Sequence, residues 1–257
     1  LYHDGTLSNL IVKVLPEPAV EFNHGRETPN IRNGITTFGA YADTPKEIEL
    51  VPICTNGTRE NMVALIARLK AGKYKYLGSE RTFKTRFAYN GVVTVPSPEN
   101  VLEECGRLLH EHPDWIGNSD LNKLFLVYTP EATYSKDDES APYYQVKKYL
   151  LEQGVPCQMV DTPTLDDPDW KDLNLALNIV AKCGVTPWVL PNSIPDADFF
   201  VGLSYTQNRQ RGSTRLLGYA TVFNQFGNWE FYLGNTNTFS YEERTQYFAS
   251  LTQRTLE

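Results

Sequence analysis

Short apolar runs alternate along this chain with longer segments that have helical spacing. The runs of strand length are Ile48–Cys54, Gly91–Val95, Leu124–Thr129 and Val155–Val160. Between them, apolar residues recur every three or four positions, which predicts helices at Thr58–Ala71 and Pro98–Glu111, a helix that carries Tyr144, and one that closes at Lys182. Because strands and helices alternate, the pattern predicts an α/β fold whose parallel sheet is covered on both faces.

The two ends of the chain have a different pattern. Residues 1–46 predict short strands and turns, including an apolar run at Leu10–Leu15. After Trp188 the chain is rich in β-formers, with a hairpin turn at residues 225–228 and a helix at Tyr241–Leu256. We therefore divide the chain into a lead-in (1–46), an α/β domain (47–190) and a further β-rich unit (191–257).

Composition places the protein among ordinary globular chains. Of its 257 residues, 41% are hydrophobic and 21% are charged. No apolar run approaches the roughly 18 residues that span a bilayer, and the first residues lack the pattern of a signal peptide. The four cysteines are far apart and form no CxxC pair, which argues against zinc and for reduced thiols. We expect a cytoplasmic protein with no membrane partner.

The charge is unevenly distributed. A net charge of −7 argues against a polyanionic partner, but basic residues dominate the segment from Arg68 to Arg86, where Tyr74, Tyr76 and Phe83 lie between them. Basic residues with interleaved aromatics can track a strand of nucleic acid. They can equally be a solvated edge strand that lysines protect from aggregation. The residues alone leave both interpretations open.

Residues 141–184 gather ring, ammonium and amide side chains. These are Tyr144, Lys148, Gln158, Asn174, Asn178 and Lys182. Tyr144 and Lys148 are four residues apart, and the asparagines and Lys182 repeat at the same spacing, so each set shares one helix face. A ring stacks a base, and ammonium and amide groups bind phosphate. The alternative is two amphipathic helices with solvated polar faces.

The order Tyr144-x-x-x-Lys148, Gln158, then Lys182 before Gly184-Val-Thr-Pro-Trp188, resembles the MID domain of Argonaute and PIWI proteins. The resemblance implies a Rossmann-like fold in which Tyr144 stacks on the first base of a guide strand. It implies that Lys148, Gln158 and Lys182 bind the 5′-phosphate of that guide, and that the loop before Tyr144 checks the identity of the first base.

The resemblance extends to further contacts of the phosphate. Asn178 stands where some members carry another phosphate-binding Lys, and Asn174 stands where many carry Asn, so both are expected phosphate contacts. A divalent cation, Mg²⁺ or Mn²⁺, can bridge the phosphates in this family, with Gln158 among its ligands.

Residues 197–206 and 218–234 resemble the opening of the PIWI domain, an RNase H-like sheet. The first metal-binding Asp of that family should follow Gly202 and Leu203, but this chain has Ser204, and a hydroxyl is a poor ligand where an anionic oxygen is needed. The chain also ends before the later acids of the family. We therefore expect no cleavage, and expect the remaining PIWI part or an effector protein to complete the sheet.

The predicted function is recognition of a target strand by a bound guide, RNA or DNA, whose 5′-phosphate is held by the chain. The alternative is a Rossmann-like domain or enzyme that binds a nucleotide or a sugar, with Tyr144 and Lys148 as surface residues. A third possibility is a scaffold subunit that binds only protein.

Overall fold

The computed structural model describes residues 17–118, 122–130, 140–166, 171–191, 197–207, 216–234 and 238–257. The expected strand at Leu10–Leu15 lies outside these residues, as do residues 131–139 of the loop expected to check the first base. Within the described part, no helix has both the length and the apolar character needed to cross a membrane. All four cysteines are free thiols, as the sequence predicted.

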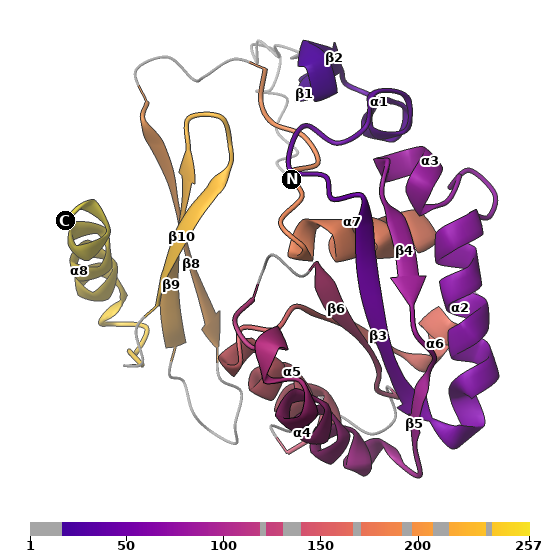
Figure 1. Cartoon of the computed structure of the whole chain (residues 1–257). Helices are drawn as coiled ribbons and strands as arrows, with labels where there is room; N and C mark the ends of the chain where they lie inside the picture. Colours follow the sequence, from indigo (N-terminus) through magenta and orange to yellow (C-terminus); the bar gives the residue numbers. More distant parts are fainter. Residues whose placement is uncertain are drawn as a thin grey trace, which may run out of the picture.

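A parallel five-stranded sheet forms the centre of the larger part of the molecule (Figure 1). Its strands are β3 (Glu47–Thr55), β4 (Arg86–Tyr89), β5 (Val93–Val95), β6 (Lys123–Tyr128) and β7 (Cys157–Val160). The order is β4-β3-β6-β7, with β5 also paired to β3, and every pair is parallel. The predicted parallel sheet is therefore confirmed, and β7 lies at one end of it.

Helices cover both faces of this sheet because side chains of a buried strand point alternately to either side. In β6, Leu124 and Leu126 face one apolar cluster, while Phe125 and Val127 face the other. The first cluster includes residues of α2 (Arg59–Ala71), α3 (Ser79–Phe83), α6 (Thr162–Leu165) and α7 (Asp172–Lys182). The second includes residues of α4 (Val101–Glu111) and α5 (Pro142–Glu152).

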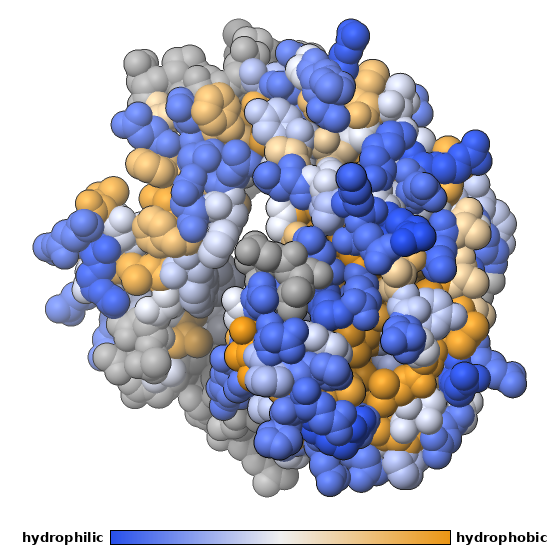
Figure 2. All heavy atoms as spheres, viewed as in Figure 1, coloured by the Kyte–Doolittle hydropathy of each residue, from blue (hydrophilic) through white to orange (hydrophobic). Residues whose placement is uncertain are grey.

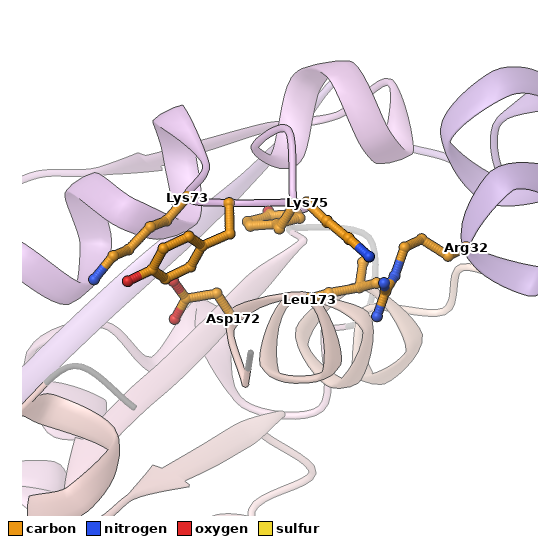
Figure 3. A pocket seen from close by; sticks show the side chains of 7 residues that line it. Arg32, Lys73, Lys75, Asp172 and Leu173 are labelled. Carbon is orange, nitrogen blue, oxygen red and sulfur yellow. The ribbon is translucent and has the colours of Figure 1, made fainter. Parts of the chain in front are cut away.

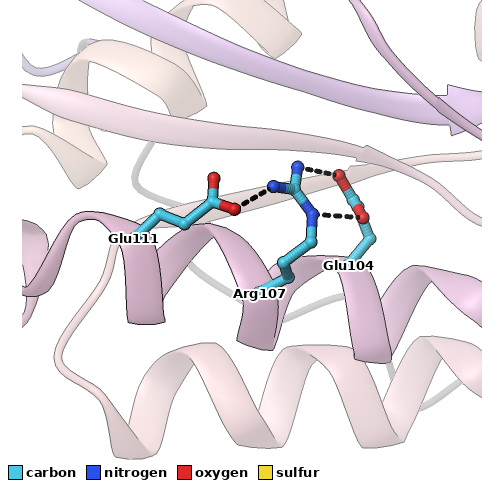
Figure 4. A network of polar contacts seen from close by, with 3 residues as sticks. All are labelled: Glu104, Arg107 and Glu111. Carbon is cyan, nitrogen blue, oxygen red and sulfur yellow. Dashed lines mark hydrogen bonds and ion pairs between the residues drawn. The ribbon is translucent and has the colours of Figure 1, made fainter.

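The outer surface of α4 is charged. Arg107 lies between Glu104 and Glu111, one turn away on either side, and donates hydrogen bonds to both carboxylates (Figure 4). Such exposed pairs at i,i+3 and i,i+4 add a few tenths of a kcal/mol to a helix. This network therefore stabilises α4 locally and is remote from the fold's core.

The lead-in contains a helix that the sequence analysis did not predict. Strands β1 (Val20–Phe22) and β2 (Arg26–Thr28) pair as a small antiparallel hairpin, and α1 (Ile31–Phe38) follows. The helix begins because the Asn30 side chain accepts a hydrogen bond from the Asn33 N–H at 3.0 Å, which satisfies an N–H that the helix leaves unpaired. This N-cap is the signal that the prediction of strands and turns overlooked.

A second, antiparallel sheet lies beside the first (Figure 1). It consists of β8 (Phe199–Gln207), β9 (Leu216–Asn224) and β10 (Trp229–Gly234), with β9 in the middle. The predicted hairpin turn is confirmed between β9 and β10, where the Asn224 side chain accepts from the N–H groups of Phe226 and Asn228. Helix α8 (Arg244–Leu256) packs on β9, and its Tyr247 hydroxyl donates to the Gly218 carbonyl at 3.0 Å.

Large apolar side chains on the two outer strands of this second sheet are exposed. They include Phe199, Leu203, Tyr205, Trp229, Phe231 and Tyr232. Figure 2 shows apolar side chains gathered over this part of the molecule, at the left of the view. The second sheet is therefore much less completely buried than the first.

The buried second face of the parallel sheet generates a stability prediction. Phe125 in β6 is fully buried, and its ring packs edge-on against Trp115 at 6.1 Å. We expect Phe125→Ala to lower the free energy of unfolding by about 3–5 kcal/mol, because it leaves a cavity. Leu151→Ala, at a side chain that is 61% exposed, should change it by less than about 0.5 kcal/mol. Urea unfolding followed by circular dichroism measures both, and equal losses would contradict the burial described here.

Candidate nucleic-acid interface

Two of the predicted site residues meet at the free edge of β7. Lys182 is the last residue of α7, and its ammonium group donates hydrogen bonds to the Gln158 side-chain oxygen at 2.8 Å and to the Cys157 carbonyl at 2.7 Å. The Gln158 amide nitrogen donates in turn to the Met159 carbonyl at 2.8 Å. A cation at a helix C-terminus is favoured by the helix dipole. The contact fixes the end of α7 against the sheet edge and orients both side chains.

A second ammonium group approaches Lys182 from α5. Lys147 and Lys182 line the same groove of about 350 Å³, together with Leu151, Cys157 and the turn that leads into β7. Burial lowers the pKa of Lys182, and the positive charge of Lys147 lowers it further, while Cys157 acts in the opposite direction. Because the two side chains line one groove, the positive charge of Lys147 disfavours the charged form of Lys182.

Lys148, which the sequence analysis named, lies on a different side of α5. Its side chain is 76% exposed and forms an ion pair with Glu152 at 3.9 Å. It borders an outer groove of about 490 Å³ that also includes Tyr143, Tyr144, Lys147 and Leu151. Lys147 lines both grooves and Lys148 only the outer one. The structure therefore brings Lys147, rather than Lys148, to the lysine of α7.

Two tyrosine rings also line the outer groove. Tyr143 and Tyr144 are edge-on to each other, with ring centres 5.0 Å apart. The Lys147 ammonium group donates to the Tyr143 hydroxyl at 3.2 Å and lies 5.3 Å from the centre of that ring. The Lys147 ammonium group thus contacts the Tyr143 side chain, and the sequence analysis named neither residue. The signal was present, since Tyr-x-x-x-Lys occurs at 143/147 as well as at 144/148.

Both rings also border a hollow of about 340 Å³ at the carboxyl ends of β6 and β7. Thr129, Asp161 and Thr164 line its polar part. The Thr129 hydroxyl is buried and has no hydrogen-bond partner in the described part of the chain. Ligands of open parallel sheets bind at this end of the strands, so the hollow is where the fold offers room for a small organic group.

Asn174 and Asn178 are exposed on α7, two turns and one turn before Lys182. Their spacing places them on the helix face that leads to the lysine. Neither is part of the contact between Lys182 and Gln158. Their roles as phosphate contacts stay predictions.

The residues at this edge do not by themselves form a site for a divalent cation. The Gln158 oxygen already accepts from the Lys182 ammonium, and the charges of Lys147 and Lys182 oppose a further cation. Within the described ranges, no group of three or more His, Cys, Asp or Glu side chains is placed to hold a metal ion. Mg²⁺ favours several oxygen ligands, which these donors do not supply.

The fold is that of the MID domain and the start of the PIWI domain of prokaryotic Argonaute proteins, as the sequence resemblance implied. Clostridium butyricum Argonaute, bound to a guide DNA (5′ deoxycytidine) and a 19-mer target DNA, matches 96% of this chain with a TM-score of 0.64 and 19% identity. Marinitoga piezophila Argonaute in complex with 5′ OH guide RNA matches 92% with a TM-score of 0.57 and 8% identity.

Aquifex aeolicus Argonaute matches 93% of this chain with a TM-score of 0.52 and 20% identity. The chain spans about a third of each of these proteins, with coverages of 34%, 36% and 34% of their lengths. Neither a protein-family model nor a curated protein sequence matches the chain. The likeness is therefore one of fold.

The proximity of Lys147 to Lys182 can be tested directly. Lys147→Gln removes a positive charge beside Lys182, so we expect the pKa of Lys182 to rise toward its ordinary value of 10.5. Lys148→Gln, which removes the same charge one residue further along α5, should leave it nearly unchanged. Titration of the lysine side chains by NMR measures both. A larger shift in the Lys148 variant would contradict the orientation of α5.

Proposed function

We propose that this chain binds the 5′-phosphorylated end of a guide strand, RNA or DNA, and presents the strand for pairing with a complementary target. The observation that carries the proposal is that Lys147 and Lys182 line one groove, where Lys182 also donates to the Gln158 side-chain amide. Two ammonium groups supply charge-assisted hydrogen bonds to phosphate, and the amide adds a neutral polar group. The likeness in fold to Argonaute structures that contain guide strands supports the binding of a guide in general.

We infer a position for the terminal nucleotide from the course of the two grooves. Its phosphate occupies the inner groove between Lys147 and Lys182, where the cost of burying ammonium groups is offset by an anion. Lys147 also borders the outer groove, which ends at Tyr143 and Tyr144. A base extended in that direction stacks on a tyrosine ring, an interaction that tolerates any base.

The proposal therefore modifies the roles expected from the sequence. Lys147 takes the phosphate contact of α5 in place of Lys148, which is exposed and paired with Glu152. Tyr143 joins Tyr144 as a stacking residue. Gln158 and Lys182 keep their expected roles, and Asn174 and Asn178 remain proposed contacts of the phosphate through their side-chain amides.

We also propose that these residues hold the guide without cutting the target. Ser204 lies in β8 opposite Tyr219 of β9, and its hydroxyl stands where the resembled family carries the first metal-binding carboxylate. A neutral hydroxyl holds a divalent cation far less well than an anionic oxygen. The exposed apolar residues of β8 and β10 are assigned to contacts with the rest of a PIWI domain or with an effector protein.

The proposed contact with the terminal phosphate can be tested by comparing strands with and without it. Lys147→Gln should weaken binding of a 5′-phosphorylated oligonucleotide roughly ten- to a hundred-fold, which is the loss of one hydrogen bond to a charged group. Binding of the 5′-hydroxyl form should change much less. Lys148→Gln serves as the matched control and should cost less than about three-fold for either strand. Fluorescence anisotropy measures all four combinations, and equal losses for both strand ends would refute the pocket.

The lowered pKa of Lys182 predicts a pH dependence of this preference. The ammonium group binds phosphate only while it is protonated, and burial places its pKa below the ordinary 10.5. The phosphate itself is already doubly charged above roughly pH 7, since its second pKa is about 6. We therefore expect the affinity ratio of 5′-phosphate to 5′-hydroxyl strands to fall as the pH rises from 7 toward 10. A ratio that stays constant over this range would show that Lys182 does not contact the phosphate.

A further inference from the structure

The side-chain amide of Gln158 is held in one orientation. Its nitrogen donates to the Met159 carbonyl at 2.8 Å, and its oxygen accepts from the Lys182 ammonium group at 2.8 Å. Turning the amide over would place an N–H group against an ammonium group and an oxygen against a carbonyl oxygen, so both contacts would become repulsive. The two neighbours therefore settle which end of the amide faces Lys182.

The ammonium group of Lys182 is oriented by two acceptors that belong to β7. One is the side-chain oxygen of Gln158, and the other is the Cys157 carbonyl oxygen at 2.7 Å. An ammonium group carries three N–H groups, whose directions relative to one another are fixed. Once two of them are directed at acceptors, the direction of the third is fixed as well. For this third N–H no acceptor lies among the described residues, so it is the one that can bind an anion.

The contribution of Gln158 is separable from that of the backbone carbonyl. With the Cys157 carbonyl alone, the ammonium group could rotate about a single hydrogen bond. The side chain of a lysine has about 2 kcal/mol of rotamer entropy, part of which is lost when it is held in one place for a ligand. A lysine that is oriented before the ligand arrives loses less on binding. Gln158 therefore preorganises Lys182.

The backbone of α7 is fixed independently of this contact. Asp172, at the start of the helix, is buried and pairs with Arg68 at 3.3 Å. Figure 3 shows this start of α7, with Asp172 beside the loop of residues 73–76. Four further residues of the helix are buried in the first apolar cluster, namely Leu175, Ala176, Ile179 and Val180. Loss of the Gln158 amide would therefore release the side chain of Lys182 and leave the helix in place.

The other lysine of the inner groove is held in a different way. The Lys147 ammonium group donates to the Tyr143 hydroxyl, one turn earlier on its own helix. Within the described part of the chain, Gln158 forms no hydrogen bond with Lys147. A change at Gln158 therefore acts on one of the two ammonium groups and leaves the other as it was.

We propose that Gln158 is a positioning residue for Lys182. It supports the binding of an anion chiefly by directing the third N–H of that ammonium group into the groove shared with Lys147. This inference rests on the proposed function and refines one part of it, because the amide's own contact with the phosphate becomes the smaller part of its effect. Gln158 and Lys182 then act as one unit, and the effects of changing them are not additive.

A double-mutant cycle tests this dependence. The measured quantity is the ratio of affinities for 5′-phosphorylated and 5′-hydroxyl oligonucleotides, by fluorescence anisotropy. Lys182→Met should lower the ratio roughly ten- to a hundred-fold, and Gln158→Met, which keeps the length of the side chain, roughly three- to ten-fold. In a chain that already carries Lys182→Met, adding Gln158→Met should lower the ratio by less than about two-fold, because no ammonium group is left to orient.

The outcomes separate this inference from the proposed function. Equal losses from Gln158→Met with and without the Lys182 ammonium group, or no loss at all, would overturn the inference and leave the phosphate groove standing. A ratio that Lys182→Met leaves unchanged would refute the groove and the inference together. The matched control is Gln145→Met, since Gln145 of α5 is exposed and lines neither groove. It should keep the ratio within about two-fold of the original.

The orientation of Lys182 can also be measured without any ligand. Carbon-13 NMR relaxation of the lysine Cε groups reports their motion on the picosecond to nanosecond timescale. We expect Gln158→Met to make Cε of Lys182 more mobile and to leave that of Lys147 unchanged. Urea unfolding of the same variant, with a loss below about 1 kcal/mol, establishes that it is folded. Unchanged mobility of Lys182 in the folded variant would overturn the inference whatever the oligonucleotides show.

Discussion

Burial of both faces of the parallel sheet is the constraint from which the rest of the structure follows. Strand β6 sends alternate side chains into two apolar clusters, so helices must cover the sheet on both sides. Strand β7 is the last strand of the sheet, and α5 and α7 pack against it from opposite faces. Their side chains can therefore meet beyond the edge of β7. Lys147 arrives there from one face and Lys182 from the other, and both line a groove with Cys157.

The energetic balance at this edge explains why it is suited to an anion. Taking an ammonium group out of water costs free energy, and the hydrogen bonds from Lys182 to Cys157 and Gln158 offset only part of that cost, since the pKa of Lys182 stays lowered. The positive charge of Lys147 repels that of Lys182 and lowers the pKa of Lys182 further. Among the described residues no carboxylate lines this groove, so the phosphate proposed above would supply the missing negative charge. In that proposal the binding of the anion and the packing of α7 are coupled through the side chain of Lys182.

The sequence predicted the sheet more securely than the rotation of the helices that cover it. Buried parallel strands are continuous apolar runs, so the strand at Leu124–Thr129 was visible without the structure. The helix that carries Tyr144 was equally visible, but its rotation was not, because tyrosine–lysine pairs occur in two adjacent registers. The rotation is set by Val146 and Leu150, which are buried against the sheet. The residues they pack with, such as Cys157, come from β7, so the sequence of the helix alone does not reveal it. The capped helix at Asn30 was missed for a different reason, since it is only 8 residues long and contains Gly34 and two threonines, which have low helix propensity.

The distribution of charge reconciles an acidic chain with the polyanionic ligand proposed for it. A net charge of −7 acts over the whole molecule, but at 0.1 M salt such fields are screened beyond about 10 Å. Binding then depends on the charges near the strand. Helix α7 illustrates this, because Asp172 at its start pairs with Arg68, while Lys182 at its end lines a groove with Lys147. Local charge placed by the fold, and not the overall sum, decides which surfaces of this chain can hold a phosphate.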